Sequence, residues 1–276
     1  MLKKLASQQT VFYPPARQKP VIDFHVHLPL DAERRGASPS KVAGELLSYV
    51  EREGVEAAVL VPVAPYHSND FAAKVAEVGS GRVVAFASVV PNPLDAALGE
   101  LRRAVEDLGL QGLSLHPPLQ GFCLRNPQVW HLLRFAGEEL GVPVLVHGPP
   151  STVYVRSAVV QAPWLNGPED YALLPHVAPR TTIVLSDPGS TAALELFLGV
   201  AASSRNIYLD TSHGLLRLAR AHPAALESLA EKVLLGTGYP LSGERAGELA
   251  AAVRELFGAG AEKVLRGNAV ELLGLR

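Results

Sequence analysis

The chain has 276 residues, of which 48% are hydrophobic and 19% charged, and its formal net charge is -2. This composition is typical of a soluble globular protein with a full core, and the small net charge excludes a general attraction to nucleic acid or to acidic membrane surfaces. No apolar run approaches the ~20 residues needed to cross a bilayer. Because the single cysteine, Cys123, cannot form an internal disulfide, we expect a protein of the reducing cytoplasm.

A polar, proline-bearing arm over residues 1–20 precedes a regular alternation of short β-like runs and longer helical patterns. The β-like runs are Val21–Val26, Val55–Val61, Val83–Val89, Gly112–His116, Pro143–His147, Thr181–Ser186, Asn206–Asp210 and Lys232–Leu235. The segments between them carry apolar residues at three- and four-residue spacing, which is typical of helices. Each is a plausible crossover between parallel strands.

Most of these β-like runs lack polar alternation, as expected for strands that are covered by a barrel core inside and by helices outside. Eight β/α units in ~250 residues match the size of one closed (β/α)₈ barrel. An open sheet that binds a dinucleotide would need a glycine-rich turn after the first strand, where this sequence reads His27-Leu28-Pro29-Leu30. We therefore predict an arm at residues 1–20 and a single α/β domain, a TIM barrel, over residues 21–276.

The first β-like run carries Asp23, His25 and His27 at every second position. Because alternate residues of a strand share a face, these three side chains are expected to point the same way. Two imidazoles side by side can chelate zinc or a similar divalent ion. In the alternative interpretation, the histidines only form hydrogen bonds inside a polar core.

Histidines gather where a barrel has its catalytic residues, at the carboxyl ends of the strands and in the loops just after them. The histidines at such positions are His25, His27, His67, His116, His147 and His213. His147 closes an apolar run and supplies a third imidazole beside the pair on the first strand. Three neutral imidazoles can hold one ion, by preference zinc, and lower the pKa of a bound water to around 7. Alternatively, His147 forms a hydrogen bond across the barrel mouth.

Several segments together resemble the amidohydrolase superfamily of metal-dependent TIM-barrel enzymes, in the branch that includes aminocarboxymuconate-semialdehyde decarboxylase and the amidohydrolase 2 hydrolases. The matching segments are Ile22–His27, Gly112–Pro117, Pro143–Gly148, Asn206–Ser212, and Glu262–Leu265 with Asn268-Ala269. Their order and spacing make the resemblance specific. It implies metal ligands at the strand 1 histidine pair, the strand 5 histidine and a strand 8 aspartate, with a strand 6 histidine as ligand or proton shuttle.

Two positions depart from that pattern. Asp187 stands where the strand 6 histidine is expected, and Gly238 replaces the strand 8 aspartate. The strand 8 carboxylate both completes the metal shell and takes a proton from the bound water, so this chain lacks the usual general base. Asp187 could replace it as a ligand and catalytic group, or it could instead cap the helix that follows. His116 or His213 could take over proton transfer.

Candidates for substrate binding lie around the same rim. The segment from 148 to 171 is long for a connection between a strand and a helix, and such loops often act as lids. Candidate residues for contacts with substrate are Arg125, Tyr154, Arg156, Trp164 and Tyr239. The arginines could clamp a carboxylate through two hydrogen bonds, or they could be solvated surface charges.

The sequence predicts a metal-dependent hydrolase that attacks a small amide, ester or lactone with a metal-activated water. The first alternative is nonoxidative decarboxylation of an unsaturated or aromatic acid on the same fold. The second is a degenerate barrel that binds a small molecule without turnover, which the glycine at position 238 favours. We expect a small-molecule substrate, no nucleic acid or membrane partner, and a possible homo-oligomer.

Overall fold

A computed structural model describes residues 20–148, 166–216, 220 and 223–275. Most of the predicted arm and of the predicted lid lie outside these ranges. None of the described helices is both long enough and apolar enough to cross a membrane.

The predicted strands are present and run parallel to one another, so the predicted barrel fold is confirmed. They are β1 (Val21–Val26), β2 (Val55–Leu60), β3 (Val83–Ala85), β4 (Ala87–Ser88), β5 (Leu113–Leu115), β6 (Val144–His147), β7 (Ile183–Ser186), β8 (Ile207–Asp210) and β9 (Val233–Leu234). β3 and β4 are two parts of one predicted strand, separated by Phe86.

The strands form two sheets that are joined at both edges. One sheet has the order β1-β2-β3 and the other runs from β4 to β9 in sequence order. Between β3 and β4 the chain stays paired with β2, because Phe86 N donates to Leu60 O at 2.9 Å. At the other edge, Phe24 N donates to Leu235 O at 2.7 Å, and His27 N donates to Tyr239 O at 2.6 Å. The chain after β9 therefore lies beside β1, and the strands surround a common interior.

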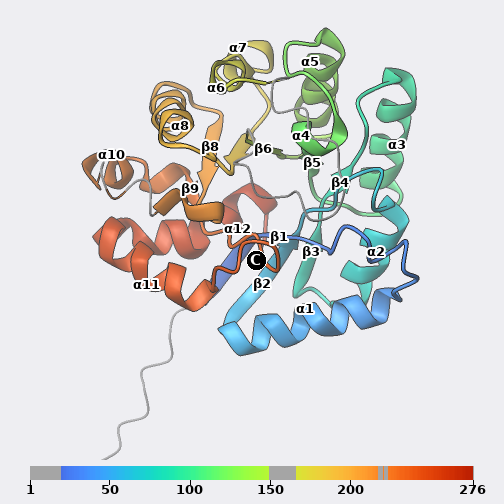
Figure 1. The fold of residues 1–276 in the computed structure, drawn as a ribbon, viewed down its shortest axis with the longest axis horizontal. Helices are drawn as coiled ribbons and strands as arrows, with labels where there is room; N and C mark the ends of the chain where they lie inside the picture. The colour runs from blue at the N-terminus through green and yellow to red at the C-terminus, as the bar shows by residue number, and fades with distance from the viewer. Residues whose placement is uncertain (1–19, 149–165, 217–219, 221–222, 276) are drawn as a thin grey trace, which may run out of the picture.

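Helices surround the strands (Figure 1). They are α1 (Pro39–Glu53), α2 (Asn69–Val78), α3 (Leu94–Glu106), α4 (Pro117–Gln120), α5 (Pro127–Arg134), α6 (Pro168–Tyr171), α7 (Leu174–Val177), α8 (Thr191–Ser203), α10 (Pro223–Ser228), α11 (Ala246–Phe257) and α12 (Asn268–Leu273). Helix α1 shows how the sequence sets their limits. Ser38 Oγ accepts from Lys41 N at 3.2 Å, Pro39 occupies the first turn, and Gly54 ends the helix with φ of 67°.

The core has two layers. Inside the barrel, Phe24 and Phe86 pack edge to face with their ring centroids 5.7 Å apart. A larger apolar layer fills the space between the strands and the surrounding helices. Burial on both faces explains why the strands read as continuous apolar runs rather than as alternating ones.

A bulge in β1 overturns one prediction about that strand. Between Asp23 and Val26 the strand advances three residues, while the paired stretch of β2 from Ala58 to Leu60 advances two. One extra residue in a strand interrupts its alternation of faces. The Asp23 side chain bonds to Tyr49 of helix α1, whereas His25 points to the barrel mouth. The prediction that Asp23 shares a face with the histidines is wrong.

Candidate metal centre

Three histidine rings meet at the mouth of the barrel. His25 lies in β1, His27 follows that strand, and His147 ends β6. The Nε2 atoms of His25 and His27 are 2.8 Å apart, and Nε2 of His147 lies 3.1 Å and 3.3 Å from them, respectively. All three side chains are buried. The predicted convergence of the three imidazoles is therefore present.

The second ring nitrogen of each histidine, Nδ1, is bonded to an oxygen that only accepts hydrogen bonds. These acceptors are the carboxylate of Asp210 for His25 at 2.8 Å, the carbonyl of Val61 for His27 at 3.1 Å, and the carbonyl of Leu115 for His147 at 3.1 Å. Each Nδ1 therefore carries the proton of its neutral ring. Each Nε2 presents a lone pair toward the other two rings.

This donor set fits one divalent metal ion. Three lone pairs at such short separations repel one another unless a cation lies between them. Metal–nitrogen bonds of about 2.0–2.1 Å place neighbouring ligand nitrogens roughly 3 Å apart, as found here. An oxygen acceptor on the far ring nitrogen is also the usual arrangement that fixes the tautomer of a metal-bound histidine.

The electrostatic surroundings of two of these rings differ. Burial, reinforced by His116 and the two other histidines, holds the pKa of His147 well below its usual value, which keeps the ring neutral. Burial alone would lower the pKa of His25 too. The carboxylate of Asp210, assisted by Asp187 and Asp23, outweighs burial and raises the pKa of His25. A proton and a metal ion therefore compete for His25 more than for His147.

Asp187 lies at the end of β7 beside this centre. Its carboxylate, that of Asp210 and a ring nitrogen of His25 form a second group of donor atoms, all within 4.8 Å of one another. The alternative that Asp187 caps the next helix is wrong, because Ser190 is the N-cap of α8 and its Oγ accepts from Ala193 N at 3.2 Å. Direct ligation by Asp187 stays a prediction.

His116 lies against the three-histidine centre. Its ring stacks on that of His147, with centroids 4.3 Å apart and planes 21° from parallel. Its Nδ1 accepts from Leu119 N at 3.3 Å and so caps helix α4. The neutral ring therefore carries its proton on Nε2. His213 lies in the short helix Ser212–Gly214, and its side chain falls outside the described residues.

His67 has a different environment from the other histidines at the rim. Its Nδ1 accepts from Val63 N at 3.2 Å, and its Nε2 donates to Pro29 O at 3.1 Å. Both ring nitrogens thus bond to backbone, and the ring joins the loop after β1 to the loop after β2. His67 holds these loops together.

Gly238 adopts φ of 69°, a left-handed conformation that favours glycine. Its amide donates to His25 O at 2.8 Å, which fixes this turn against β1. The substitution of the expected aspartate therefore coincides with a backbone that suits glycine. An aspartate is tolerated in this conformation less well than glycine.

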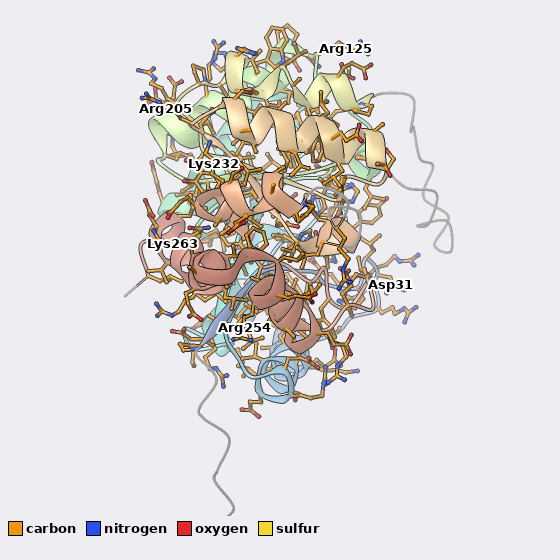
Figure 2. All side chains as sticks on the ribbon, turned by 90° about the vertical axis from the view of Figure 1, so that its left-hand side faces the viewer. Asp31, Arg125, Arg205, Lys232, Arg254 and Lys263 are labelled. Atoms are coloured by element: carbon orange, nitrogen blue, oxygen red, sulfur yellow. The ribbon has the colours of Figure 1, made fainter. Side chains whose placement is uncertain are left out.

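Two of the residues that were predicted to contact substrate, Arg125 and Tyr239, lie within the described ranges. Arg125 is 58% exposed and pairs with Asp170 at 3.3 Å, and in Figure 2 it lies near the upper edge of the molecule. The ring of Tyr239 stacks on that of Tyr49, at 4.0 Å between centroids, and so packs against helix α1. These positions favour structural roles for both residues. Tyr154, Arg156 and Trp164 lie outside the described residues.

The sequence analysis missed Asp210 and Ser212. Asp210 accepts the Nδ1 proton of His25, and Ser212 Oγ lies against the carboxylates of Asp210 and Asp187. Both residues belong to the matching segment Asn206–Ser212, and Asp210 ends a predicted strand. A carboxylate at the end of a barrel strand was the signal that could have indicated its role.

Comparisons with known proteins agree with this fold. The amidohydrolase family model Amidohydro_2 matches residues 22–275. An uncharacterised TIM-barrel protein from Bordetella bronchiseptica is 22% identical, with 93% of this chain and 99% of that chain covered and a TM-score of 0.74. A 2,6-dihydroxybenzoate decarboxylase from Rhizobium is 20% identical, with 94% and 99% covered and a TM-score of 0.65.

A dihydroxybenzoic acid decarboxylase from a Polaromonas species, solved with manganese and the inhibitor 2-nitroresorcinol, is also similar. It is 20% identical, with 94% of this chain and 98% of that chain covered and a TM-score of 0.62. A search of curated proteins found no match. Because the family model covers the barrel from its first strand to its last helix, the chain belongs to the amidohydrolase family.

Proposed function

We propose that this chain is a metal-dependent enzyme that removes a carboxylate, without oxidation, from a small aromatic or unsaturated acid. The observation that carries the proposal is the tautomer of His116, which presents a proton donor beside the three-histidine centre. Two proteins of similar fold are named as decarboxylases of dihydroxybenzoic acids. These findings favour decarboxylation over the hydrolysis predicted from the sequence.

The two reactions place different demands on the site. Hydrolysis by a metal-activated water needs a base to take the proton from that water. That base was expected shortly after β9, where the family has an aspartate and this chain has Gly238. Decarboxylation needs no base of this kind. It needs stabilisation of negative charge and one proton for the carbon that loses its carboxylate.

In the proposed reaction, His25, His27 and His147 would hold one divalent ion. When bound, that ion supplies positive charge that orients the acid and stabilises the electron pair left on it. The bond between the carbon and its carboxylate breaks, the electron pair stays on the carbon, and carbon dioxide leaves. His116 then donates its Nε2 proton to that carbon and recovers a proton from solvent. Zinc suits three imidazoles, and manganese is the ion in one protein of similar fold.

The test measures carbon dioxide release from dihydroxybenzoates and related unsaturated acids by protein loaded with zinc or with manganese. His116→Asn is the informative variant, because Asn retains an acceptor for the amide of Leu119 but lacks the Nε2 donor. General acid catalysis is typically worth about 10²–10⁴-fold, so kcat should fall by that factor while metal content stays unchanged. His131→Gln, at an exposed position of α5, should leave kcat unchanged.

Parallel assays with esters, amides and lactones distinguish the alternatives. Hydrolysis without decarboxylation would restore the first prediction. Bound metal with neither activity, on substrates that bind, would indicate the degenerate binder.

A further inference from the structure

The hydroxyl of Ser212 lies between two carboxylates at the metal centre. Its Oγ is 2.8 Å from Oδ1 of Asp187 and also contacts Oδ1 of Asp210. Because a serine hydroxyl has one proton, it donates to one of these carboxylates at a time. The Ser212 amide donates to the same Asp210 oxygen at 2.9 Å. Asp187 follows β7, Asp210 ends β8, and Ser212 begins the next turn, so one serine connects two neighbouring strand ends.

This serine extends a chain of hydrogen bonds that begins at a metal ligand. The other carboxylate oxygen of Asp210, Oδ2, holds Nδ1 of His25 at 2.8 Å. Because the Ser212 amide already donates to Asp210, the hydroxyl proton can go to Asp187, and the chain runs from His25 through Asp210 and Ser212 to Asp187. Asp210, Ser212 and His25 are fully buried, so these bonds form where water does not compete for them.

The backbone at Asp187 is held in an uncommon conformation. Its φ is 52°, in the left-handed region that residues other than glycine seldom adopt. Gly148 packs directly against it, because a Cβ at position 148 would lie 2.2 Å from Asp187 O. Gly148 N also donates to Ser186 O at 2.8 Å. The fold therefore fixes the backbone of Asp187, and the hydroxyl of Ser212 lies within hydrogen-bond distance of its carboxylate.

We propose that Ser212 is a positioning residue for the metal centre. It fixes the carboxylate of Asp187 next to His25 and orients Asp210, which in turn orients the His25 ring. This inference rests on the metal-binding part of the proposed function. It does not require that decarboxylation be the reaction. Partners of this kind, one step removed from the ion, typically change metal affinity by about 10- to 100-fold when they are lost.

The test compares the metal dissociation constants of the full-length protein and its variants, by competition with a chromogenic chelator. Ser212→Ala should weaken zinc binding by about 10-fold or more. Ser212→Thr, which keeps a hydroxyl, should restore most of that loss. The matched control is Ser186→Ala, because Ser186 is equally buried and adjoins Asp187, but its Oγ has no hydrogen-bond partner among the described residues. This control should bind zinc as the parent protein does.

Two further measurements separate positioning from general destabilisation. In cobalt-substituted protein, Ser212→Ala should shift the visible absorption bands, and Ser186→Ala should not. In a double-mutant cycle, Ser212→Ala and Asp187→Asn should be strongly non-additive in metal affinity, because both remove the same connection. This cycle gives an answer even if the threonine does not fit at the buried position.

The outcomes distinguish this inference from the proposed function. Unchanged zinc affinity and cobalt spectra in Ser212→Ala, with only a lower thermal midpoint, would overturn the inference and leave the metal centre intact. A parent protein that binds no divalent ion would overturn both. Ser212-dependent metal binding without decarboxylation would overturn only the proposed reaction.

Discussion

Strand β1 carries two buried polar clusters two residues apart, and their polar atoms face different partners: donors of the chain in one cluster, other acceptors in the second. Asp23 accepts hydrogen bonds from the Tyr49 hydroxyl at 2.6 Å, from the Thr237 hydroxyl at 2.7 Å and from the Thr237 amide at 3.0 Å. The carboxylate is thus enclosed by donors from its own chain. His25 and its neighbours instead direct the lone pairs of their Nε2 atoms toward one another.

The difference separates structure from function on a single strand. Buried polar groups are nearly always satisfied, so a cluster that satisfies itself needs no explanation beyond the fold. A cluster of converging acceptors needs something that is not part of the chain. Burial raises the pKa of Asp23, and the donors from Tyr49 and Thr237 oppose that effect. The same donors attach β1 to helix α1 and to the turn after β9, and so hold His25 in place.

The largest expected effect is on the histidine cluster. His147→Ala removes one of three converging nitrogens, so we expect the metal dissociation constant to rise by at least about 100-fold. Without metal, the variant should lose only the stability that comes from packing of the imidazole ring. The substitution also relieves the repulsion between lone pairs, so no further loss is expected. Competition with a chelator measures the first quantity and urea denaturation the second. Metal affinity equal to that of the parent would contradict the assigned centre.

The converse effect is expected at Asp23. Asp23→Asn replaces a charged acceptor with a neutral one, and hydrogen bonds to charged groups are worth about 1.5–3 kcal/mol. The free energy of unfolding should therefore fall by about 2 kcal/mol. Metal affinity should change far less than in His147→Ala. If Asp23→Asn abolished metal binding while leaving stability unchanged, the distinction between the two clusters would be wrong.

Most of the fold could be predicted because burial leaves a clear pattern in the sequence. The apolar runs that predicted the strands are apolar because core packs on both of their faces. The bulge in β1 has no such pattern, since it depends on how β1 pairs with β2, and strict alternation therefore placed Asp23 on the wrong face.

The candidate site was predictable where one residue type carries the chemistry. We could identify His25, His27 and His147 because histidines at the ends of barrel strands indicate a metal site. The role of Ser212 was not predictable, because serine is common and its partner Asp187 is 25 residues away. The capping alternative for Asp187 failed because Ser190, three residues later, begins the helix. Only the observed helix start decides between such neighbouring candidates.

The smallest predicted effect concerns His67. Like Asp23, this residue forms its hydrogen bonds with groups of its own chain. Burial lowers its pKa below the ordinary value of 6.5. The unfolded chain therefore takes up a proton at His67 as the pH falls through about 6.5, while the folded chain does not, and this lowers the stability of the fold. His67→Gln keeps a donor for Pro29 and cannot titrate. It should reduce the loss of stability between about pH 7.5 and 5.5.

Urea denaturation of metal-free protein at several pH values measures this effect, and His131→Gln, at an exposed position, is the control. His25 and His147 contribute to the pH dependence in both proteins, so only the difference between variants is informative. An identical pH dependence in His67→Gln and parent protein would show that His67 titrates alike in the folded and unfolded chains.

The central claim is that the three converging histidines hold one divalent ion. Elemental analysis of the purified protein after supplementation with zinc or manganese tests it most directly, with His147→Ala measured beside it. We predict about one ion per parent chain and almost none in the variant. Less than about a tenth of an ion per parent chain, or equal content in the two proteins, would contradict the claim.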